Sequence, residues 1–144
     1  YERPENKLAW CKRDGGCPHC DRFRNRFAEH LTEMAERWRA FGLPEEFPFA
    51  VGRSKGLHTV GCPVVRRYMP DGFPTYGPDD VEALRAFAHA HNAYGQCHYD
   101  LQDLPAGVVF SPLSAEEARA WMVEHTGPKG GRQYKRCQRC APTP

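Results

Sequence analysis

The sequence predicts a small α+β domain with about three helices, short strands and long loops. Three segments repeat apolar residues at helical spacing, and the apolar runs between them are long enough only for short strands. Thirteen glycines and thirteen prolines in 144 residues indicate many turns. Seven cysteines, with the spacing Cys-x2-Cys occurring twice, indicate metal ligands. We therefore expect a domain that is stabilised by zinc.

Three helices are predicted. Residues 21–42 place large apolar side chains at steps of three and four, which is one face of a helix. Residues 78–95 begin at a proline followed by acidic residues and end at a glycine. Residues 114–127 open with a capping box, in which Ser114 and Glu117 satisfy each other's backbone N–H groups.

Short apolar runs predict strands at residues 57–60, 63–68 and 107–110. The stretch 44–56 is rich in proline, glycine and charge, and it is predicted to be a linker. No apolar run approaches the roughly 18 residues that span a bilayer. The first residues also lack the plan of a secretory signal, so we expect a cytoplasmic protein without membrane contact.

Cys137 and Cys140 have the spacing of a zinc knuckle, whose tight turn directs two thiolates at one ion. A closed structural site needs two more ligands, and the nearest suitable pair upstream is His58 and Cys62. Both pairs lie beside predicted strands or turns, so they could face each other across a small sheet. One histidine and three cysteines form an ordinary structural zinc site.

Three stretches, "HTVGCPVVRR", "FSPLSAEEARAW" and "YKRCQRCAP", together resemble the metal-binding domain of the Ada DNA-repair methyltransferase family. The resemblance covers roughly residues 57–142. Residues 69–106 would be an insertion, and the chain would divide into an N-terminal zinc-knuckle and helix unit, 1–50, and an Ada-like module, 51–144. The positions that carry the pattern are Phe110, Glu116, Glu117, Ala118, Tyr134, Cys137, Arg139, Cys140 and Pro142.

The resemblance implies a zinc-bound α+β module that approaches the DNA backbone. In the Ada family the first metal ligand is a cysteine that accepts a methyl group from DNA phosphotriesters. This chain has His58 at the matching position. We therefore expect binding rather than repair chemistry, and alkyl transfer through Cys62 is the less favoured alternative.

A second zinc site is predicted in the N-terminal part of the chain, which makes two zinc ions in all. Cys17 and Cys20 again have knuckle spacing, with a helix directly after them. The four predicted ligands are Cys11, Cys17, Cys20 and Cys97. His98 and His30 compete with Cys97 for the fourth position, and His19 is a weaker candidate because it lies inside the knuckle.

Basic residues gather around the predicted C-terminal site. Five lie within eleven residues that contain no acid, and two follow Cys62. These seven residues are Arg66, Arg67, Lys129, Arg132, Lys135, Arg136 and Arg139. A basic cluster drawn from distant segments to one metal site favours contacts with phosphates, and the expected partner is nucleic acid, in the first place DNA. Neutralising the thiolates is the alternative purpose.

The leading functional hypothesis is a nucleic-acid-binding module without its own catalysis. No phosphate-binding glycine loop, hydrolase elbow or histidine-rich open metal site is visible, which weighs against an enzyme. A regulatory or protein-interaction module is the main alternative, in which the surface of the helix over 21–42 and the insertion 69–106 would bind a protein partner.

Overall fold

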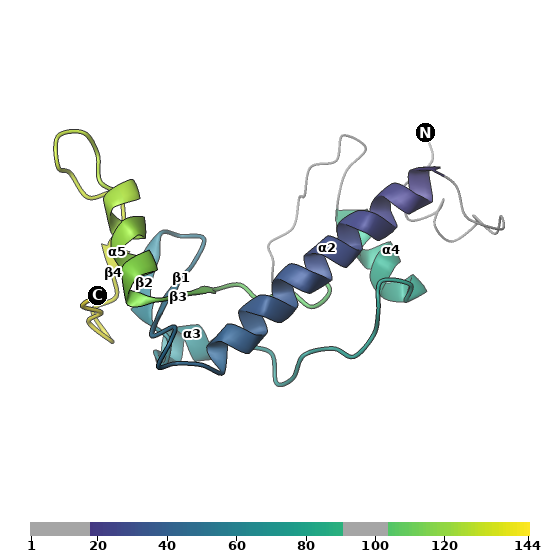
Figure 1. The fold of residues 1–144 in the computed structure, drawn as a ribbon, viewed down its shortest axis with the longest axis horizontal. Coiled ribbons are helices and arrows are strands. Elements are labelled where there is room, and N and C mark those ends of the chain that lie inside the picture. The colour runs from purple at the N-terminus through teal and green to yellow at the C-terminus, as the bar shows by residue number, and fades with distance from the viewer. Residues whose placement is uncertain (1–17, 91–103) are drawn as a thin grey trace. The chain divides into compact units, whose positions relative to one another are not determined.

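A computed structural model describes residues 18–90 and 104–144, apart from the side chains of residues 18–20 and of His89. These residues form four helices and a four-stranded sheet (Figure 1), so the predicted α+β class is confirmed. No helix among them is long and apolar enough to cross a membrane. The elements in chain order are α2 (Pro18–Phe41), β1 (Phe49–Val51), β2 (Gly56–Thr59), α3 (Pro63–Arg67), α4 (Val81–Ala90), β3 (Ser111–Leu113), α5 (Ala115–Glu124) and β4 (Lys135–Arg136).

The chain divides into two compact units, each made of two separate stretches of sequence. The first unit comprises Tyr1–Ala35 and Gly72–Gly107, and the second comprises Glu36–Asp71 and Val108–Pro144. Most of the segment predicted as an insertion therefore belongs to the same unit as the first part of α2.

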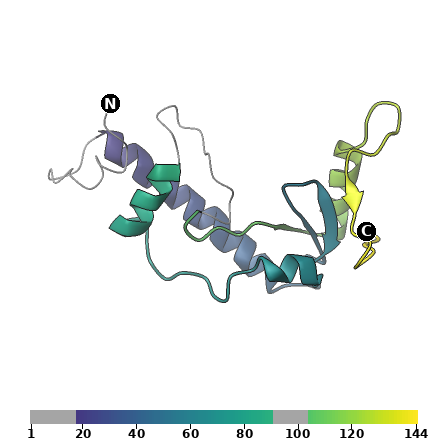
Figure 2. The same ribbon diagram turned by 180° about the vertical axis from the view of Figure 1, so that it is seen from behind.

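In the first unit, α4 packs against the apolar face of α2, and the two helices lie side by side in Figures 1 and 2. Phe27 of α2 is fully buried, and its ring centroid lies 5.1 Å from that of Phe87 in α4. Phe23 and Leu84 are also buried in this cluster. The predicted helix over 21–42 and its core-facing apolar stripe are thus confirmed.

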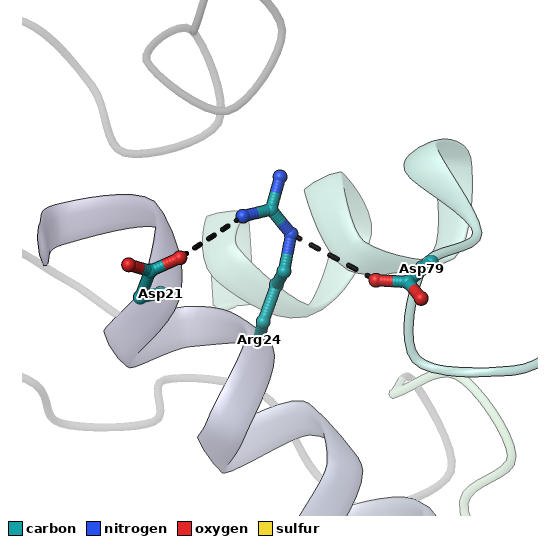
Figure 3. A network of polar contacts seen from close by, with 3 residues as sticks. All are labelled: Asp21, Arg24 and Asp79. Atoms are coloured by element: carbon teal, nitrogen blue, oxygen red, sulfur yellow. Dashed lines mark hydrogen bonds and ion pairs between the residues drawn. The ribbon is translucent and has the colours of Figure 1, made fainter. Parts of the chain in front are cut away.

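Arg24 connects α2 to the turn that precedes α4 (Figure 3). Its guanidinium lies 3.2 Å from the Asp21 carboxylate on the same helix and 3.9 Å from the carboxylate of Asp79. The Asp79 side chain is 89% exposed, so solvent screens this ion pair. We expect it to contribute at most about 1 kcal/mol to the stability of the first unit.

The helix predicted from residue 78 begins three residues later, at Val81. The Asp80 carboxylate accepts a hydrogen bond from the Ala83 N–H at 3.0 Å, and the Asp80 carbonyl accepts from Leu84. Asp80 therefore caps the helix, and Pro78 lies in the turn before it. Residues 91–95, the end of this predicted helix, lie outside the described residues.

The sheet of the second unit has the strand order β3-β1-β2-β4. β1 pairs antiparallel with both β2 and β3, whereas β2 pairs parallel with the two-residue strand β4. Helix α5 lies beside the sheet in Figures 1 and 2, and its Ala118 is buried with Phe49 and Leu57. The predicted strand at 57–60 is confirmed as β2.

The strand predicted over 63–68 is wrong, because Pro63–Arg67 form helix α3. Proline at the first helical position needs no N–H partner and has the required φ, so it favours a helix start despite the two valines that follow. Cys62 is the N-cap, and its carbonyl accepts from the Arg66 N–H at 3.0 Å.

Two further predictions are corrected. The strand predicted at 107–110 does not form; β3 lies just after it, and the Val108 carbonyl accepts a hydrogen bond from the Arg37 side chain at 2.9 Å. Its apolar residues reflect burial rather than strand pairing. The stretch 44–56, predicted as a linker, contains the central strand β1, whose Phe49 and Ala50 are buried.

The capping box at the start of α5 is confirmed. Ser114 Oγ accepts from the Glu117 N–H at 3.1 Å, and the Glu117 carboxylate accepts from the Ser114 N–H at 2.9 Å. The helix ends at Glu124, three residues before the predicted end. The chain turns back there because Thr126 pairs with Arg132 in an antiparallel bridge.

Candidate metal centre

The second unit brings the four residues of the predicted C-terminal site together. One ligand atom from each of His58, Cys62, Cys137 and Cys140 lies within 4.8 Å of the other three, so this group could hold a metal ion. His58 lies in β2 and Cys62 at the N-terminus of α3, directly after that strand. Cys137 follows β4 and Cys140 ends the next turn.

The parallel pairing of β2 with β4 places the two halves of the group beside each other. Leu57 pairs with Arg136, and the Leu57 carbonyl accepts from the Cys137 N–H at 2.9 Å. The turn after Cys137 is closed by a hydrogen bond from the Ala141 N–H to the Cys137 carbonyl at 2.9 Å. The expectation that the two ligand pairs face each other across a small sheet is therefore met.

The three sulfurs are thiols rather than disulfide partners. The Sγ atoms of Cys62 and Cys137 are 3.9 Å apart, about twice the length of a disulfide bond. Cys62 is 1% exposed, and the other two cysteines are partly buried. The Thr59 N–H donates to Cys140 Sγ at 3.2 Å, a contact that stabilises a thiolate at this position.

His58 presents a buried ring nitrogen that lacks a protein partner. Its Nδ1 is buried, and no hydrogen-bonding group of the described residues reaches it. A buried polar atom without a partner is costly, and a bound cation would satisfy it. The ring is held by Phe110, whose edge-on contact has a centroid distance of 5.4 Å.

Gly56 leaves room for the His58 ring on the same face of β2. A Cβ atom at Gly56 would lie 3.1 Å from His58 Nε2. Gly52 plays the same part for Phe110, because a Cβ there would lie 2.7 Å from Phe110 Cε1. Both glycines therefore leave space that the rings of His58 and Phe110 occupy.

The ionisation of the group follows from burial and hydrogen bonding. Burial lowers the pKa of His58, which favours the neutral imidazole that binds metals. Burial alone would raise the pKa of Cys137, but hydrogen bonds from the Cys140 and Arg139 backbone and from the neighbouring thiols lower it overall. Burial raises the pKa of Cys140, and the other two thiols add to that increase.

The second predicted metal site cannot be described in the same way. Cys11, Cys17 and Cys97, and the alternative ligand His98, lie outside the described residues, as do the side chains of His19 and Cys20. His30 is described, and its Nε2–H donates to the Pro105 carbonyl at 2.8 Å. This nitrogen of His30 therefore has a structural partner, and the second site remains a prediction.

All seven predicted basic residues belong to the second unit and are exposed. Arg66 and Arg67 lie in the last turn of α3, Lys135 and Arg136 form β4, and Arg139 lies in the turn between the two thiols. The remaining two, Lys129 and Arg132, lie between α5 and β4. Within the described part of the chain, none of the seven forms an ion pair with an acidic side chain.

Lys55 joins this basic set, although its sequence position gave no reason to include it. It is exposed in the turn between β1 and β2, with a left-handed φ of 60°. Its carbonyl accepts from the Lys135 N–H at 3.0 Å, so the two lysines are neighbours across 80 residues of sequence. The two lysines are neighbours because β4 pairs parallel with β2, and a strand of two residues cannot be predicted from the sequence.

A groove of about 540 Å³ lies elsewhere in the second unit. It is bordered by the end of α2, the turn after it and the start of β3, with Leu43, Phe47 and Pro112 among its lining residues. None of the four possible ligands lines it, so the metal group is not part of this groove.

Comparison with known proteins gives no relative: no protein-family model, no curated protein and no solved structure matches the chain.

Proposed function

We propose that the second unit is a zinc-stabilised module that binds nucleic acid, in the first place the DNA backbone, and performs no chemistry of its own. One observation carries the proposal. Exposed basic residues flank both ligand pairs, on α3 after Cys62 and around Cys137 and Cys140, and the described acidic side chains leave them unpaired.

Zinc is the metal that suits this donor set best. Three thiolates and one imidazole are soft ligands, and a closed site of this kind is typically tetrahedral. Two sulfurs at a zinc–sulfur distance of about 2.3 Å and a tetrahedral angle lie about 3.8 Å apart. The 3.9 Å between Cys62 and Cys137 agrees with that value.

The fold gives zinc a stabilising role. Against the sheet, Phe49, Leu57 and Ala118 form one buried cluster of the second unit. Structural zinc binding contributes about 10–16 kcal/mol of apparent free energy in small zinc domains. Such a contribution would hold the two stretches of the second unit together where the sheet alone has a two-residue strand.

The net charge of the second unit distinguishes between the two purposes considered for the basic residues, which are to contact phosphates and to neutralise the thiolates. The second unit has twelve lysines and arginines against seven acidic residues, a formal charge of +5, whereas the first unit has eight against eleven, or −3. Three thiolates with one Zn²⁺ carry only −1 in total. Neutralising the metal group therefore accounts for little of the excess, and a polyanionic partner accounts for the rest.

An Ada-like relationship is part of this proposal, and the motif around the four ligands supports it. Methyl transfer is not included, for two reasons. His58 occupies the acceptor position, and the sulfur of Cys62, which is 1% exposed, is out of reach of a bulky phosphotriester.

The test is DNA binding as a function of salt. Fluorescence anisotropy with a labelled duplex should give an affinity that falls steeply with salt. Replacing Arg136 and Arg139 with alanine should weaken binding at low salt and reduce the salt slope by about 2. The matched control replaces Arg22 and Arg85, two exposed arginines of the first unit, and should change little. Unchanged affinity in the Arg136/Arg139 variant would sink the proposal.

A further inference from the structure

The C-terminal end of α3 carries an exposed aromatic ring. Tyr68 is 46% exposed, and it is the only aromatic residue among the exposed large apolar residues of the described chain; the others are Leu43, Val81 and Val123. About half of this side chain is therefore free to contact a ligand.

The backbone and one face of Tyr68 are held in place. Its N–H, at the C-cap of α3, donates to the Val65 carbonyl at 3.1 Å, and the next N–H, that of Met69, donates to the Arg66 carbonyl at 3.2 Å. Its ring packs against Phe110 with a centroid distance of 6.1 Å and an interplanar angle of 47°. Phe110 in turn packs edge-on against the metal-group residue His58. Tyr68 is therefore connected to the metal centre through two aromatic contacts.

Two of the exposed basic residues directly precede this ring. Arg66 and Arg67 form the last turn of α3. The guanidinium of Arg66 lies over the Phe41 ring, 5.9 Å from its centroid, so this cation is also positioned by an aromatic neighbour. An exposed aromatic ring with neighbouring positive charges is the combination that binds single-stranded nucleic acid, in which bases stack on aromatic side chains while cations contact the phosphates.

We infer that Tyr68 is a stacking platform for an unpaired nucleobase, and that the nucleic acid bound by the second unit includes a single-stranded stretch. This inference rests on the proposed function and narrows its ligand class. In a continuous duplex the faces of the bases are covered by their neighbours, so a tyrosine ring has no face to stack on. A single strand, whether DNA or RNA, offers both the phosphates and the free base.

The alternative is that Tyr68 only shields Phe110, which is 8% exposed. A shielding role needs bulk but no aromatic ring, so Tyr68→Leu should serve it as well as Tyr68→Phe. Stacking needs the ring, so the two variants should differ. This comparison separates a ligand-binding role from a structural one.

The experiment measures binding of the zinc-loaded full chain to four labelled nucleic acids of equal length. They are oligo-dT, oligo-rU, an abasic DNA strand and a DNA duplex. Tyr68→Ala and Tyr68→Leu should weaken binding to the base-carrying single strands about tenfold or more, whereas Tyr68→Phe should stay close to the unaltered chain. Binding to the abasic strand should not change, because it retains phosphates but offers no base. Val123→Ala, which removes another exposed apolar side chain, is the control.

Several outcomes would overturn the inference. The first is that Tyr68→Ala and Tyr68→Leu bind oligo-dT and oligo-rU with the affinity of the unaltered chain. The second is that these variants lose as much affinity for the abasic strand as for the base-carrying strands. If Arg136 and Arg139 still matter in either case, the proposed function stands and only the role of Tyr68 falls. If the unaltered chain binds none of the four strands, both fall. Zinc content and thermal unfolding of each variant show whether it is folded. If Tyr68→Ala is unfolded, the comparison of Tyr68→Leu with Tyr68→Phe decides the question.

Discussion

The Sγ atoms of Cys62 and Cys137 lie 3.9 Å apart, although 75 positions separate the two residues. The two stretches of the second unit meet at this point, one through the end of β2 and the start of α3, the other through β4 and the turn that follows. Substitutions at the four possible metal ligands, His58, Cys62, Cys137 and Cys140, should therefore affect both the metal content and the stability of the whole unit.

The first prediction concerns metal stoichiometry. Cys137→Ser should remove one zinc ion, because serine is a poor ligand for zinc and three remaining donors hold it weakly. Elemental analysis should find two zinc ions in the unaltered chain, one after Cys137→Ser and one after Cys11→Ser. If the unaltered chain holds a single zinc ion and Cys137→Ser holds none, the prediction of an N-terminal site is wrong and that of the described site stands.

The second prediction concerns acid. Protons compete with the metal for the imidazole and the thiolates, so zinc should be released as the pH falls. Burial lowers the pKa of His58 from its ordinary value of 6.5, which means that more acid is needed to protonate it. Zinc release on acidification, followed with a chromophoric chelator, should therefore depend on the group at position 58.

The His58→Cys variant is the control for this experiment, since it replaces the imidazole with a fourth thiolate, whose proton affinity differs from that of histidine. If zinc release from His58→Cys follows the same pH course as release from the unaltered chain, the assigned role of His58 is contradicted.

The third prediction tests the space beside His58. Gly56→Ala places a methyl group 3.1 Å from Nε2 and should displace the ring from its position in the group. Loss of ligand orientation typically lowers metal affinity by about 10- to 100-fold. Competition with a chelator of known affinity measures the change. Gly61→Ala is the matched control, because no atom lies within 4 Å of a Cβ at that position.

The fourth prediction concerns α5. Ser114→Ala removes the acceptor for the Glu117 N–H and should lower the free energy of unfolding by about 1 kcal/mol. Glu117→Gln should be nearly neutral, because glutamine can also accept from the Ser114 N–H. Thermal or urea unfolding of the zinc-loaded chain measures both. Equal effects of the two substitutions would argue against the capping box as the source of the stability.

The sequence allowed good prediction where a local signal exists. Apolar spacing predicts α2, and the Ser114–Glu117 pair predicts the start of α5. Ligand types and knuckle spacing predict the group His58, Cys62, Cys137 and Cys140. The two helix signals need only neighbouring residues, whereas joining the two ligand pairs also needs the knowledge that a closed zinc site takes four ligands.

The remaining features depend on contacts between distant segments. Strands β1 and β4 have three and two residues, too few for a period to be visible, and they exist because neighbouring strands and burial hold them. The Val64–Val65 pair resembles a strand, but Pro63 starts a helix there. The place of Lys55 beside Lys135 follows from the parallel pairing alone.

The distance in sequence between Cys62 and Cys137 has a consequence for the growing polypeptide. At about 5–20 residues per second, a ribosome needs about 4–15 s to add the 75 residues between them. During that interval His58 and Cys62 have no partner thiols, and the edge of β2 that later receives β4 is open to other chains. Translation that stops in this interval would leave a product without Cys137 and Cys140, unable to close the group around a metal and exposed to quality-control proteases.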